Sequence, residues 1–408
     1  MKLKKIEEMY WNLKRSFQKS KRVLFILSVA ITLIHSSFGR DDTRLEREIF
    51  HEKSLNDSLL WIHPVCDKLP DDMGRRFVKL KDNSLMTFVN GKTRISGDGG
   101  KTWSEPVLIC DEPGPGRPQD GLPIFTRDGV IVIVYKDTEL MKKFDYWADV
   151  HSLEDEAYEI SKARGDVWSI RSLDGGKTWV DRQRIFKGYC GSNISIIQTK
   201  NGNIVIPIQR LVPNPGRNVT CTYVSSNNGK TWQRSNIIDL GGHGRHDGAF
   251  EATLTQLKDE RLWMLMRTPW DRFWDAYSDD NGLTWRYIWP SKIESSNSPG
   301  YITRLSSGRL VLMWNRLYPE GQNDFARRGG TPGGRTSAIA GSWHREELSI
   351  AFSEDEGKTW SKPVVIARKK GARLSYSYIF EPEPGILWLT TGQGDLRLRA
   401  REKDLIKY

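Results

Sequence analysis

The chain has 408 residues, of which 38% are hydrophobic and 28% are charged. This composition excludes a disordered chain and is sufficient for a large buried core. The formal net charge is +11, but the first 39 residues contain eight Lys/Arg and two Glu, so the remainder carries about 11 − 6 = +5. A charge this modest does not require a nucleic-acid partner, and a mildly positive surface favours an anionic substrate.

The N-terminal segment has the pattern of an export signal. Its eight basic residues precede an apolar run of 12 residues, 23–34, which is shorter than the roughly 20 residues that span a bilayer. Small residues follow at Ser37 and Gly39, where a signal peptidase would act. We therefore predict that residues 1–39 are a signal peptide and that the mature chain is secreted, periplasmic or on the cell surface. The alternative is an uncleaved membrane anchor; otherwise we expect no integral membrane domain.

Residues 40–408 are predicted to form one domain built from repeated β-hairpins. Six segments share an apolar run, a polar turn with Gly, Asn or Asp, and a second apolar run, which is typical of half-buried strands. These segments are residues 77–89, 122–135, 194–208, 252–266, 301–314 and 378–390.

A second repeat follows each of the first five hairpins. It has the form Ser-x-Asp-x-Gly-x-Thr-Trp, with Asn227 in place of Asp in the third copy, and we call it the Asp box. Asp, Ser and Thr can hydrogen-bond nearby backbone groups, and Gly suits a positive φ, so each box is predicted to be a tight turn. Each closing Trp is expected to pack between neighbouring units. The boxes are residues 96–103, 172–179, 225–232, 278–285 and 353–360.

Six hairpins and five boxes predict an all-β fold, a six-bladed β-propeller with four antiparallel strands in each blade. The sixth blade runs out of chain near Tyr408, so we expect an earlier segment, around residues 59–65, to supply its outer strand and close the ring. Two insertions interrupt the repeats, at about residues 136–165 and 317–342. Insertions of this size are either functional loops or flexible surface excursions.

The cysteines do not indicate a metal site. None of the four forms a CxxC pair, and both disulfides and buried free thiols are compatible with an exported chain. They are Cys66, Cys110, Cys190 and Cys221. We predict neither a metal nor an organic cofactor, and the oligomeric state is not indicated by the sequence.

Asp boxes at this spacing, together with six hairpins, resemble the sialidase (neuraminidase) superfamily, from about residue 73 to the C-terminus. The resemblance implies a substrate whose anomeric carbon carries a carboxylate, which three arginines clamp. It also implies that a tyrosine is the nucleophile, because a carboxylate would be repelled by that anionic centre. A glutamate takes the phenolic proton, and an aspartic acid protonates the leaving oxygen.

Four residues match the family pattern by position. Glu251 opens the fourth hairpin and resembles the base, and Arg267 closes the hairpin and resembles the second clamp arginine. Arg345 precedes the last box with the spacing of the third arginine. Tyr376, opening the last hairpin as Tyr-Ser, resembles the nucleophile. Each residue also has a plain structural interpretation, as a strand-end carboxylate, a surface arginine, an ion-paired arginine or a core tyrosine.

The first arginine and the general acid are less defined. Arg75 or Arg76 could be the first clamp residue, since both precede the first hairpin. The family's acid lies between the first hairpin and the first box, but residues 88–95 contain no Asp or Glu. Asp120 and His246 are the candidates for the general acid in this chain. Further alternatives are His243, Asp145 and Asp149.

Three functions follow as hypotheses. The first is a secreted exo-glycosidase that retains configuration and removes a terminal sialic acid or related acidic sugar from a glycoconjugate. The second is a non-catalytic propeller that binds an acidic glycan or a protein. The third is an enzyme of the same fold with lyase chemistry on uronate sugars, in which a tyrosine and a histidine share the proton transfers.

Overall fold

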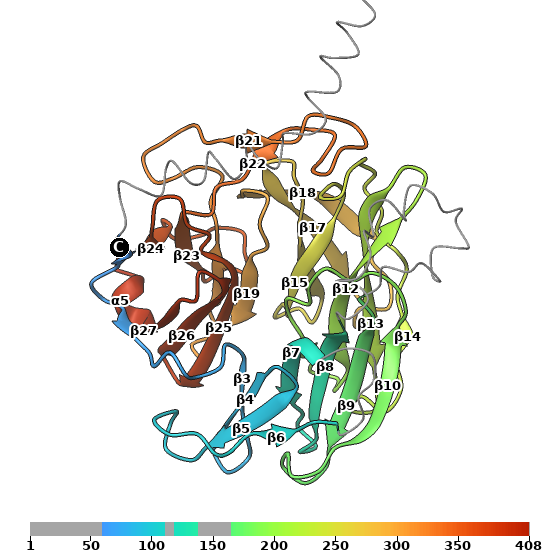
Figure 1. Cartoon of the computed structure of the whole chain (residues 1–408), viewed down its shortest axis with the longest axis vertical. Helices are drawn as coiled ribbons and strands as arrows, with labels where there is room; N and C mark the ends of the chain where they lie inside the picture. The colour runs from blue at the N-terminus through green and yellow to red at the C-terminus, as the bar shows by residue number, and fades with distance from the viewer. Residues whose placement is uncertain (1–58, 111–117, 138–164, 408) are drawn as a thin grey trace, which may run out of the picture. The chain divides into compact units, whose positions relative to one another are not determined.

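The computed structural model describes residues 59–110, 118–137 and 165–407, and in these residues six antiparallel sheets form a closed ring (Figure 1). The predicted six-bladed propeller is confirmed, with consecutive hairpins forming consecutive blades. In five blades the first strand lies innermost in the ring, as Figure 1 shows for β3, β7, β15, β19 and β25.

The first three blades take their strands in chain order. Blade one contains β3 (Phe77–Lys79), β4 (Leu85–Val89), β5 (Lys92–Ser96) and β6 (Val107–Leu108). Blade two contains β7 (Pro118–Phe125), β8 (Ile131–Asp137), β9 (Val167–Ser172) and β10 (Val180–Phe186). Blade three contains β11 (Ile197–Gln198), β12 (Ile204–Val212), β13 (Arg217–Ser225) and β14 (Gln233–Arg234).

The second half of the ring follows the same order. Blade four contains β15 (Phe250–Gln256), β16 (Leu262–Arg267), β17 (Arg272–Ser278) and β18 (Tyr287–Glu294). Blade five contains β19 (Tyr301–Arg304), β20 (Leu310–Trp314), β23 (Glu347–Ser353) and β24 (Val364–Arg368). Blade six contains β25 (Ser375–Glu383), β26 (Ile386–Gln393) and β27 (Arg397–Arg401), and the chain ends in α5 (Glu402–Leu405).

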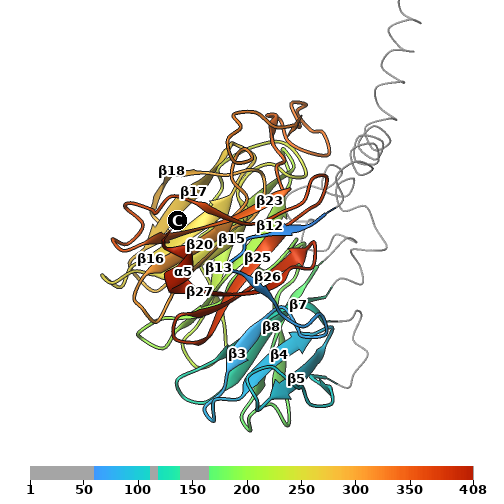
Figure 2. The ribbon, with the colours of Figure 1, turned by 90° about the vertical axis from the view of Figure 1, so that its left-hand side faces the viewer.

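The ring closes through two short N-terminal strands. β2 (Asp67–Lys68) pairs with β27 and completes blade six, whereas β1 (Trp61–Ile62) pairs with β24 and adds a fifth strand to blade five. An early segment therefore closes the ring as predicted, but the closing strand lies just after residues 59–65. Figure 2 shows the first and last blades side by side, where β25 contacts β3.

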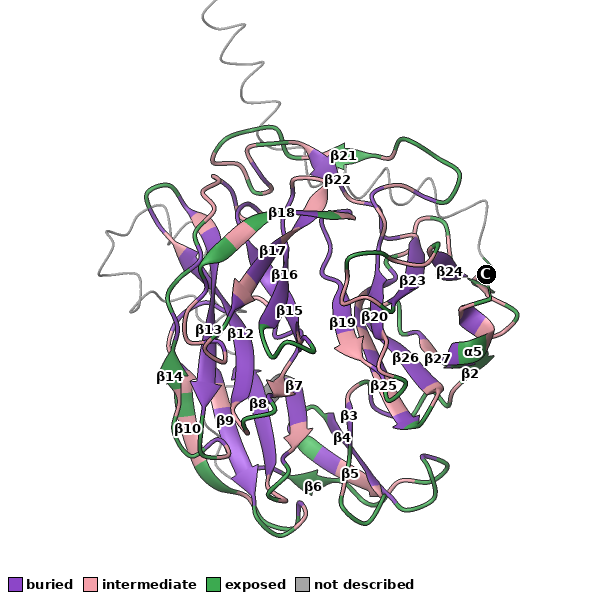
Figure 3. Cartoon of the chain, turned by 180° about the vertical axis from the view of Figure 1, so that it is seen from behind, coloured by how far each residue is buried: buried purple, intermediate pink, exposed green. Residues whose placement is uncertain are grey.

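The core lies between the blades. The second strands of blades two, four and five (β8, β16 and β20) are buried along their whole length, because each is covered on both faces by neighbouring blades. Such strands appear as continuous apolar runs, while outer strands such as β10 and β18 keep many exposed residues (Figure 3).

Each Asp box is a turn held by its own side chains. In the fifth box, the Ser353 hydroxyl donates to Asp355 at 2.9 Å, and the Gly357 amide donates to the Ser353 oxygen at 2.9 Å. The Thr359 amide and hydroxyl donate to the two Asp355 oxygens at 2.8 and 2.6 Å. These bonds from Thr359 lower the pKa of Asp355 to about 2. In the third box, Asn227 replaces these contacts by accepting from an amide at 2.9 Å and donating to a hydroxyl at 2.8 Å.

The boxes also attach each blade to the one before it. Gly357 has a φ of +81°, and a Cβ there would lie 2.3 Å from the Trp263 ring of blade four. Gly100 has a φ of +88°, and a Cβ would lie 2.5 Å from Trp388, so the first box attaches blade one to blade six. Only glycine satisfies both the conformation and the close approach. The expectation that box tryptophans pack between units is also met, since Trp285 donates to Thr222 of the preceding blade at 2.9 Å.

The structure describes the second insertion in full and only the ends of the first. Most of residues 136–165 lie outside the described residues, as do Asp145, Asp149 and the predicted signal at 1–39. The second insertion is described and contains the two-stranded sheet of β21 (Arg327–Arg328) and β22 (Gly341–Ser342). All four cysteines are free thiols. None of the helices in the described residues is both long enough and apolar enough to cross a bilayer.

Candidate functional site

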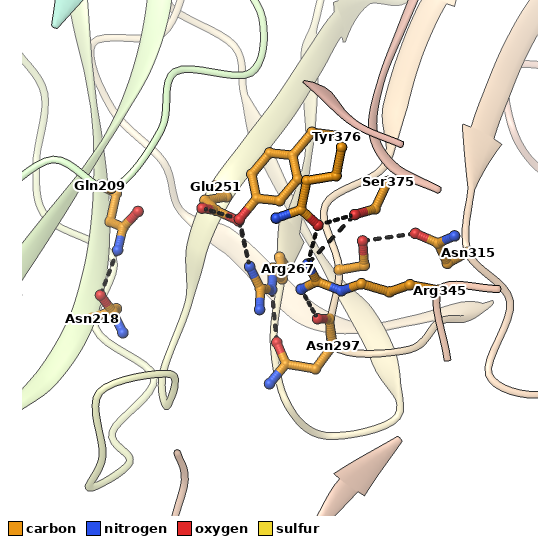
Figure 4. A network of polar contacts seen from close by, with 12 residues as sticks. Gln209, Asn218, Glu251, Arg267, Asn297, Asn315, Arg345, Ser375 and Tyr376 are labelled. Carbon is orange, nitrogen blue, oxygen red and sulfur yellow. Dashed lines mark hydrogen bonds and ion pairs between the residues drawn. The ribbon is translucent and has the colours of Figure 1, made fainter. Parts of the chain in front are cut away.

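Blades four and six bring together the predicted base, clamp and nucleophile (Figure 4). The Tyr376 hydroxyl of β25 donates to Glu251 Oε1 of β15 at 2.9 Å. Arg267, the last residue of β16, donates through Nη1 to Glu251 Oε2 at 2.5 Å and to the Tyr376 oxygen at 3.4 Å. One guanidinium therefore contacts both members of a tyrosine–carboxylate pair whose residues are 125 positions apart in the sequence.

Arg345 lies beside this group, two residues before β23. Its Nη1 donates to Gln393 Oε1 at 2.8 Å and to the Ser375 hydroxyl at 3.4 Å, and its Nη2 donates to the Asn297 carbonyl at 2.8 Å. The Asn297 side chain accepts a bond from Arg267 Nε at 2.7 Å, so this residue joins the two arginines. The guanidinium of Arg345 also lies 5.7 Å from the Tyr376 ring centre.

The site contains more buried positive than negative charge. Arg267 and Arg345 are only 1% and 4% exposed, and within the described residues Glu251 is the one carboxylate paired with either of them. Arg267 Nη2 and Arg345 Nε are buried without a hydrogen-bond partner among those residues. Burial, and then the charge of Arg267, lower the pKa of Arg345 to about 10. Because an uncompensated buried cation is costly, this arrangement favours binding of an anion.

Glu251 and Tyr376 have unusual backbone conformations. Their φ angles are +45° and +60°, in a region that residues other than glycine adopt rarely and at a cost. Gly392 leaves room opposite Tyr376, since a Cβ on it would lie 2.9 Å from the tyrosine Cβ. Burial, and then the charge of Glu251, raise the pKa of Tyr376, so the phenol is neutral at physiological pH. Removing its proton therefore requires a base, and Glu251 is in hydrogen-bond contact.

Both candidates for the first arginine line the same cavity as Tyr376. This cavity has a volume of about 260 Å³. Arg75 is exposed and forms an ion pair with Asp395 of blade six. Arg76 is half-buried and donates to the carbonyls of Asn193 and Ile194, at 3.0 Å each, in the segment leading into blade three. The structure thus places both arginines at the cavity without separating their roles.

His246 is linked to the two arginines through the rings of Phe250 and Trp343. Its ring is 6.4 Å from Phe250 and 5.4 Å from Trp343, and these two rings lie 4.4 Å from the Arg267 guanidinium and 5.1 Å from that of Arg345. Burial, followed by the charge of Arg267, lowers the pKa of His246 well below its usual value. The imidazole is therefore neutral at physiological pH.

The second insertion supports the loop that carries His246. The His246 amide donates to the Thr336 carbonyl at 2.6 Å, and the Ala338 amide donates to Asp247 Oδ2 at 2.8 Å. Arg327 of β21 forms an ion pair with Asp271 of blade four. This insertion is therefore anchored to blade four and to the loop of His246, although most of residues 320–334 are exposed.

Asp120 occupies the position in blade two that Glu251 occupies in blade four. Glu251 directly follows the residue that pairs with Arg267, and there two residues of β15 oppose one of β16. Asp120 directly follows the residue that pairs with Lys136, and there two residues of β7 oppose one of β8. The backbone thus carries the two acidic residues in matching bulges, although the side chain of Asp120 lies outside the described part of the structure.

Neutral polar residues complete the site, and the sequence did not point to them. Asn297, Ser375 and Gln393 hold the arginines, but residues of these types occur on many exposed turns and carry no distinctive spacing. The one available signal was adjacency, since Ser375 precedes Tyr376. In the described residues, no group of three or more His, Cys, Asp or Glu is arranged to hold a metal ion.

The sequence profile of the BNR repeat-like domain matches residues 81–389, which is well over half of the chain. The chain belongs to the BNR repeat-like family. No curated protein sequence matches it. The recognition of an Asp-box propeller from the sequence is thereby confirmed.

Solved structures share the fold of this BNR repeat-like chain at low sequence identity. A protein of unknown function from Dyadobacter fermentans is 16% identical with a TM-score of 0.55, covering 83% of this chain and 98% of that one. The NanB sialidase of Streptococcus pneumoniae is 12% identical with a TM-score of 0.56, covering 86% and 70%. The Trypanosoma rangeli sialidase, solved as a covalent intermediate with 2,3-difluorosialic acid, is 12% identical with a TM-score of 0.54, covering 86% and 60%. These similarities show that the chain has the sialidase fold.

Proposed function

We propose that this chain is an exo-glycosidase that removes a terminal sialic acid, or a related acidic sugar, from a glycoconjugate with retention of configuration. The observation that carries the proposal is the buried pair Arg267 and Arg345 with one carboxylate partner, Glu251, beside the hydroxyl of Tyr376. A sugar carboxylate would supply the missing negative charge. It would also accept hydrogen bonds from Arg267 Nη2 and Arg345 Nε, which have no partner in the part of the chain that the structure describes.

In the proposed binding step, Arg267 and Arg345 clamp the carboxylate of the sugar. The cavity of about 260 Å³ next to Tyr376 would hold the ring, with Arg75 and Arg76 in its wall. A carboxylate on the anomeric carbon is then fixed beside the phenolic oxygen. This geometry explains why the nucleophile is a neutral tyrosine, since an anionic carboxylate would be repelled by the sugar acid.

In the proposed chemical step, the Tyr376 oxygen attacks the anomeric carbon while its proton passes to Glu251. The glycosidic bond breaks, and the leaving oxygen takes a proton from a general acid. The result is a sugar bonded to Tyr376. Water then attacks the same carbon and gives a proton to the conjugate base of the general acid, while the bond to the tyrosine breaks and Glu251 returns its proton to the phenolate.

We propose Asp120 as the general acid, in preference to His246. Its position in β7 matches that of Glu251 in β15, which supports an approach to the substrate from a different side of the ring. His246 is less suited, because its lowered pKa leaves the imidazole neutral at physiological pH, and a neutral imidazole is a very weak acid.

A fluorogenic sialoside, assayed beside glycosides of other acidic sugars, tests the proposal. Wild-type protein should release the fluorophore from at least one of them, and Tyr376→Phe should remove turnover while retaining binding of the free sugar acid. Tyr287→Phe, a change at a tyrosine that is 52% exposed on β18, should leave the rate unchanged. Saturable binding without turnover by the wild type would refute the enzyme and leave an acidic-glycan-binding propeller. Turnover that survives Tyr376→Phe would refute the nucleophile.

We further propose that the mature protein acts outside the cytoplasm, as the basic and apolar pattern of residues 1–39 favours. N-terminal sequencing of the protein purified from its native host should begin near residue 40. Recovery of full-length chain in the membrane fraction would instead indicate an uncleaved anchor.

A further inference from the structure

Two of the box tryptophans bond to the preceding blade at a repeated position. Trp232 Nε1 donates to the Ser169 hydroxyl at 3.0 Å, and Trp285 Nε1 donates to the Thr222 hydroxyl at 2.9 Å. Ser169 and Thr222 each lie three residues before the serine that opens their own box. The repeat therefore predicts a small hydroxyl residue at the same position of every blade whose neighbour ends its box in Trp.

Blade four departs from this rule. The position three residues before Ser278 is Asp275, a carboxylate that is 7% exposed and accepts from Trp263 Nε1 of its own blade at 3.0 Å. Trp360, in the box of blade five, keeps a buried Nε1 with no hydrogen-bond partner among the described residues. The Trp179 indole also lacks one, so the missing bond alone does not mark a site. Between blades four and five, however, there is a cavity of about 790 Å³ that both Asp275 and Trp360 line.

One wall of this cavity is a stack of three aromatic rings. Trp263, Tyr277 and Trp289 lie on adjacent strands, with ring centres 6.2 and 5.1 Å apart and planes inclined by only 1° and 26°. Trp289, the outermost, is 44% exposed. The rings lie face to face with an offset, so the exposed Trp289 indole at the end of the stack is the aromatic platform, and the arrangement is not the cage that surrounds a quaternary ammonium ion. Such an indole fits the apolar C–H face of a sugar ring.

The polar lining requires a ligand that both donates and accepts hydrogen bonds. Trp360 Nε1 and Arg316 Nε are buried donors without hydrogen-bond partners among the described residues, and Asp275 is an acceptor. Hydroxyl groups satisfy both kinds of partner. The cavity is lined by charges of both signs, which nearly balance and favour a neutral ligand: Lys292, Arg316, Lys358 and Lys362 with Asp275, Glu294 and Glu356. Its volume lies within the range of about 300–1,000 Å³ that is typical of small-molecule sites.

We propose that the cleft between blades four and five is a second, non-catalytic site that binds a neutral pyranose unit of a glycan. Its aromatic platform would stack on the ring, and Asp275, Trp360 and Arg316 would bond the hydroxyls. The proposal goes beyond the glycosidase and does not rest on it, because none of the residues that carry it belongs to the tyrosine–arginine site. A catalytic propeller would use such a site to hold the uncharged part of a branched or repeated glycan.

Saturation-transfer NMR and tryptophan fluorescence with lactose, cellobiose and N,N′-diacetylchitobiose test the site on the full-length protein. At least one of these sugars should bind saturably, with a Kd on the order of 1–10 mM. Trp289→Ala should weaken that binding at least about fivefold, because it removes the exposed part of the platform. Tyr287→Ala is the matched control, since Tyr287 is an equally exposed aromatic residue of β18 outside the lining, and binding should be unchanged.

A second variant tests the repeat argument directly. Asp275→Thr restores the residue type found at Thr222, so it should give the Trp360 indole a partner and weaken sugar binding without lowering the thermal midpoint. Both variants should keep the wild-type rate on a small fluorogenic sialoside. Absence of binding by all three sugars would overturn the proposal, and so would binding that is unchanged in both Trp289→Ala and Asp275→Thr.

Discussion

Replacing Arg345 with methionine should leave the fold as stable or more stable while removing any use of acidic sugars. Arg345 is 4% exposed and forms no ion pair among the described residues. Burial, and then Arg267, lower its pKa from 12.5 to about 10. Because a change of one unit in pKa corresponds to about 1.4 kcal/mol, the charged form costs about 3 kcal/mol in the folded protein at neutral pH.

Methionine removes this cost but also removes hydrogen bonds. The two bonds at 2.8 Å, to Gln393 and the Asn297 carbonyl, are worth about 1 kcal/mol each. Gln393 keeps its 2.6 Å bond from Ser375, so one acceptor remains satisfied. The net change in the free energy of unfolding should therefore lie between about 0 and +2 kcal/mol.

Urea unfolding at neutral pH measures this change, with Arg304→Met as the matched control. Arg304 forms two bonds to the Glu356 carboxylate, at 2.9 and 2.6 Å, so its loss should destabilise the protein by about 1–3 kcal/mol. Free sialic acid should stabilise the wild type against urea but not Arg345→Met, because a ligand stabilises only the form that binds it. If Arg345→Met destabilises as strongly as Arg304→Met, the claim that Arg345 is an uncompensated charge is wrong.

Three further predictions concern the nucleophile and the boxes. Tyr376→Phe should lower kcat at least about 10³-fold, with the Kd of free sialic acid within about threefold of wild type by calorimetry. Gly357→Ala should lower the free energy of unfolding by about 2 kcal/mol or more, since the added methyl group would meet the Trp263 ring and the backbone has a positive φ. Gly385→Ala is the control, because Gly385 has a similar φ but open space around it, and it should cost about 1 kcal/mol. Asp355→Asn should be tolerated, because Asn227 occupies the same position in the third box. The pKa of Asp355 is lowered to about 2, so the stability that its ionised carboxylate contributes is present above the pKa of the unfolded chain and is lost as the pH falls through 2. The thermal midpoints of the variant and the wild type should therefore converge at that pH.

The fold was readable from the sequence because its signals are local and repeated. Each hairpin has a polar turn between apolar runs, and each box carries its own hydrogen-bond pattern, so neither depends on distant residues. The closure of the ring by an N-terminal strand could be predicted, but not which residues form that strand. The strand that completes blade six is two residues long, and the adjoining Trp61 and Ile62 pair with blade five instead, a choice that no local pattern encodes.

Site residues could be predicted from the sequence where their position in the repeat determines their position in the ring. Glu251, Arg267 and Tyr376 stand at hairpin ends, so the register of one blade determines where each lies. Arg75 and Arg76 are adjacent and point to contacts in different blades, which sequence spacing cannot distinguish. The aromatic cleft was not anticipated, because its only local signal is a carboxylate where blades one to three carry a hydroxyl.

One position of the repeat links the proposed catalytic groups. Glu251 directly follows the residue that pairs with Arg267 in blade four, and Asp120 directly follows the residue that pairs with Lys136 in blade two. Tyr376 directly follows the residue that pairs with Gln393, the last residue of β26, in blade six. The ring thus presents the proposed base, acid and nucleophile from alternate blades. If Asp120 is the acid, Asp120→Asn should slow release of a natural sugar aglycone by about 10²–10⁴-fold, because that oxygen needs a proton to depart. An aryl sialoside, whose phenolate leaves unaided, should lose far less. Equal losses on both substrates would show that Asp120 acts in binding, and the proton would then have to come from another group.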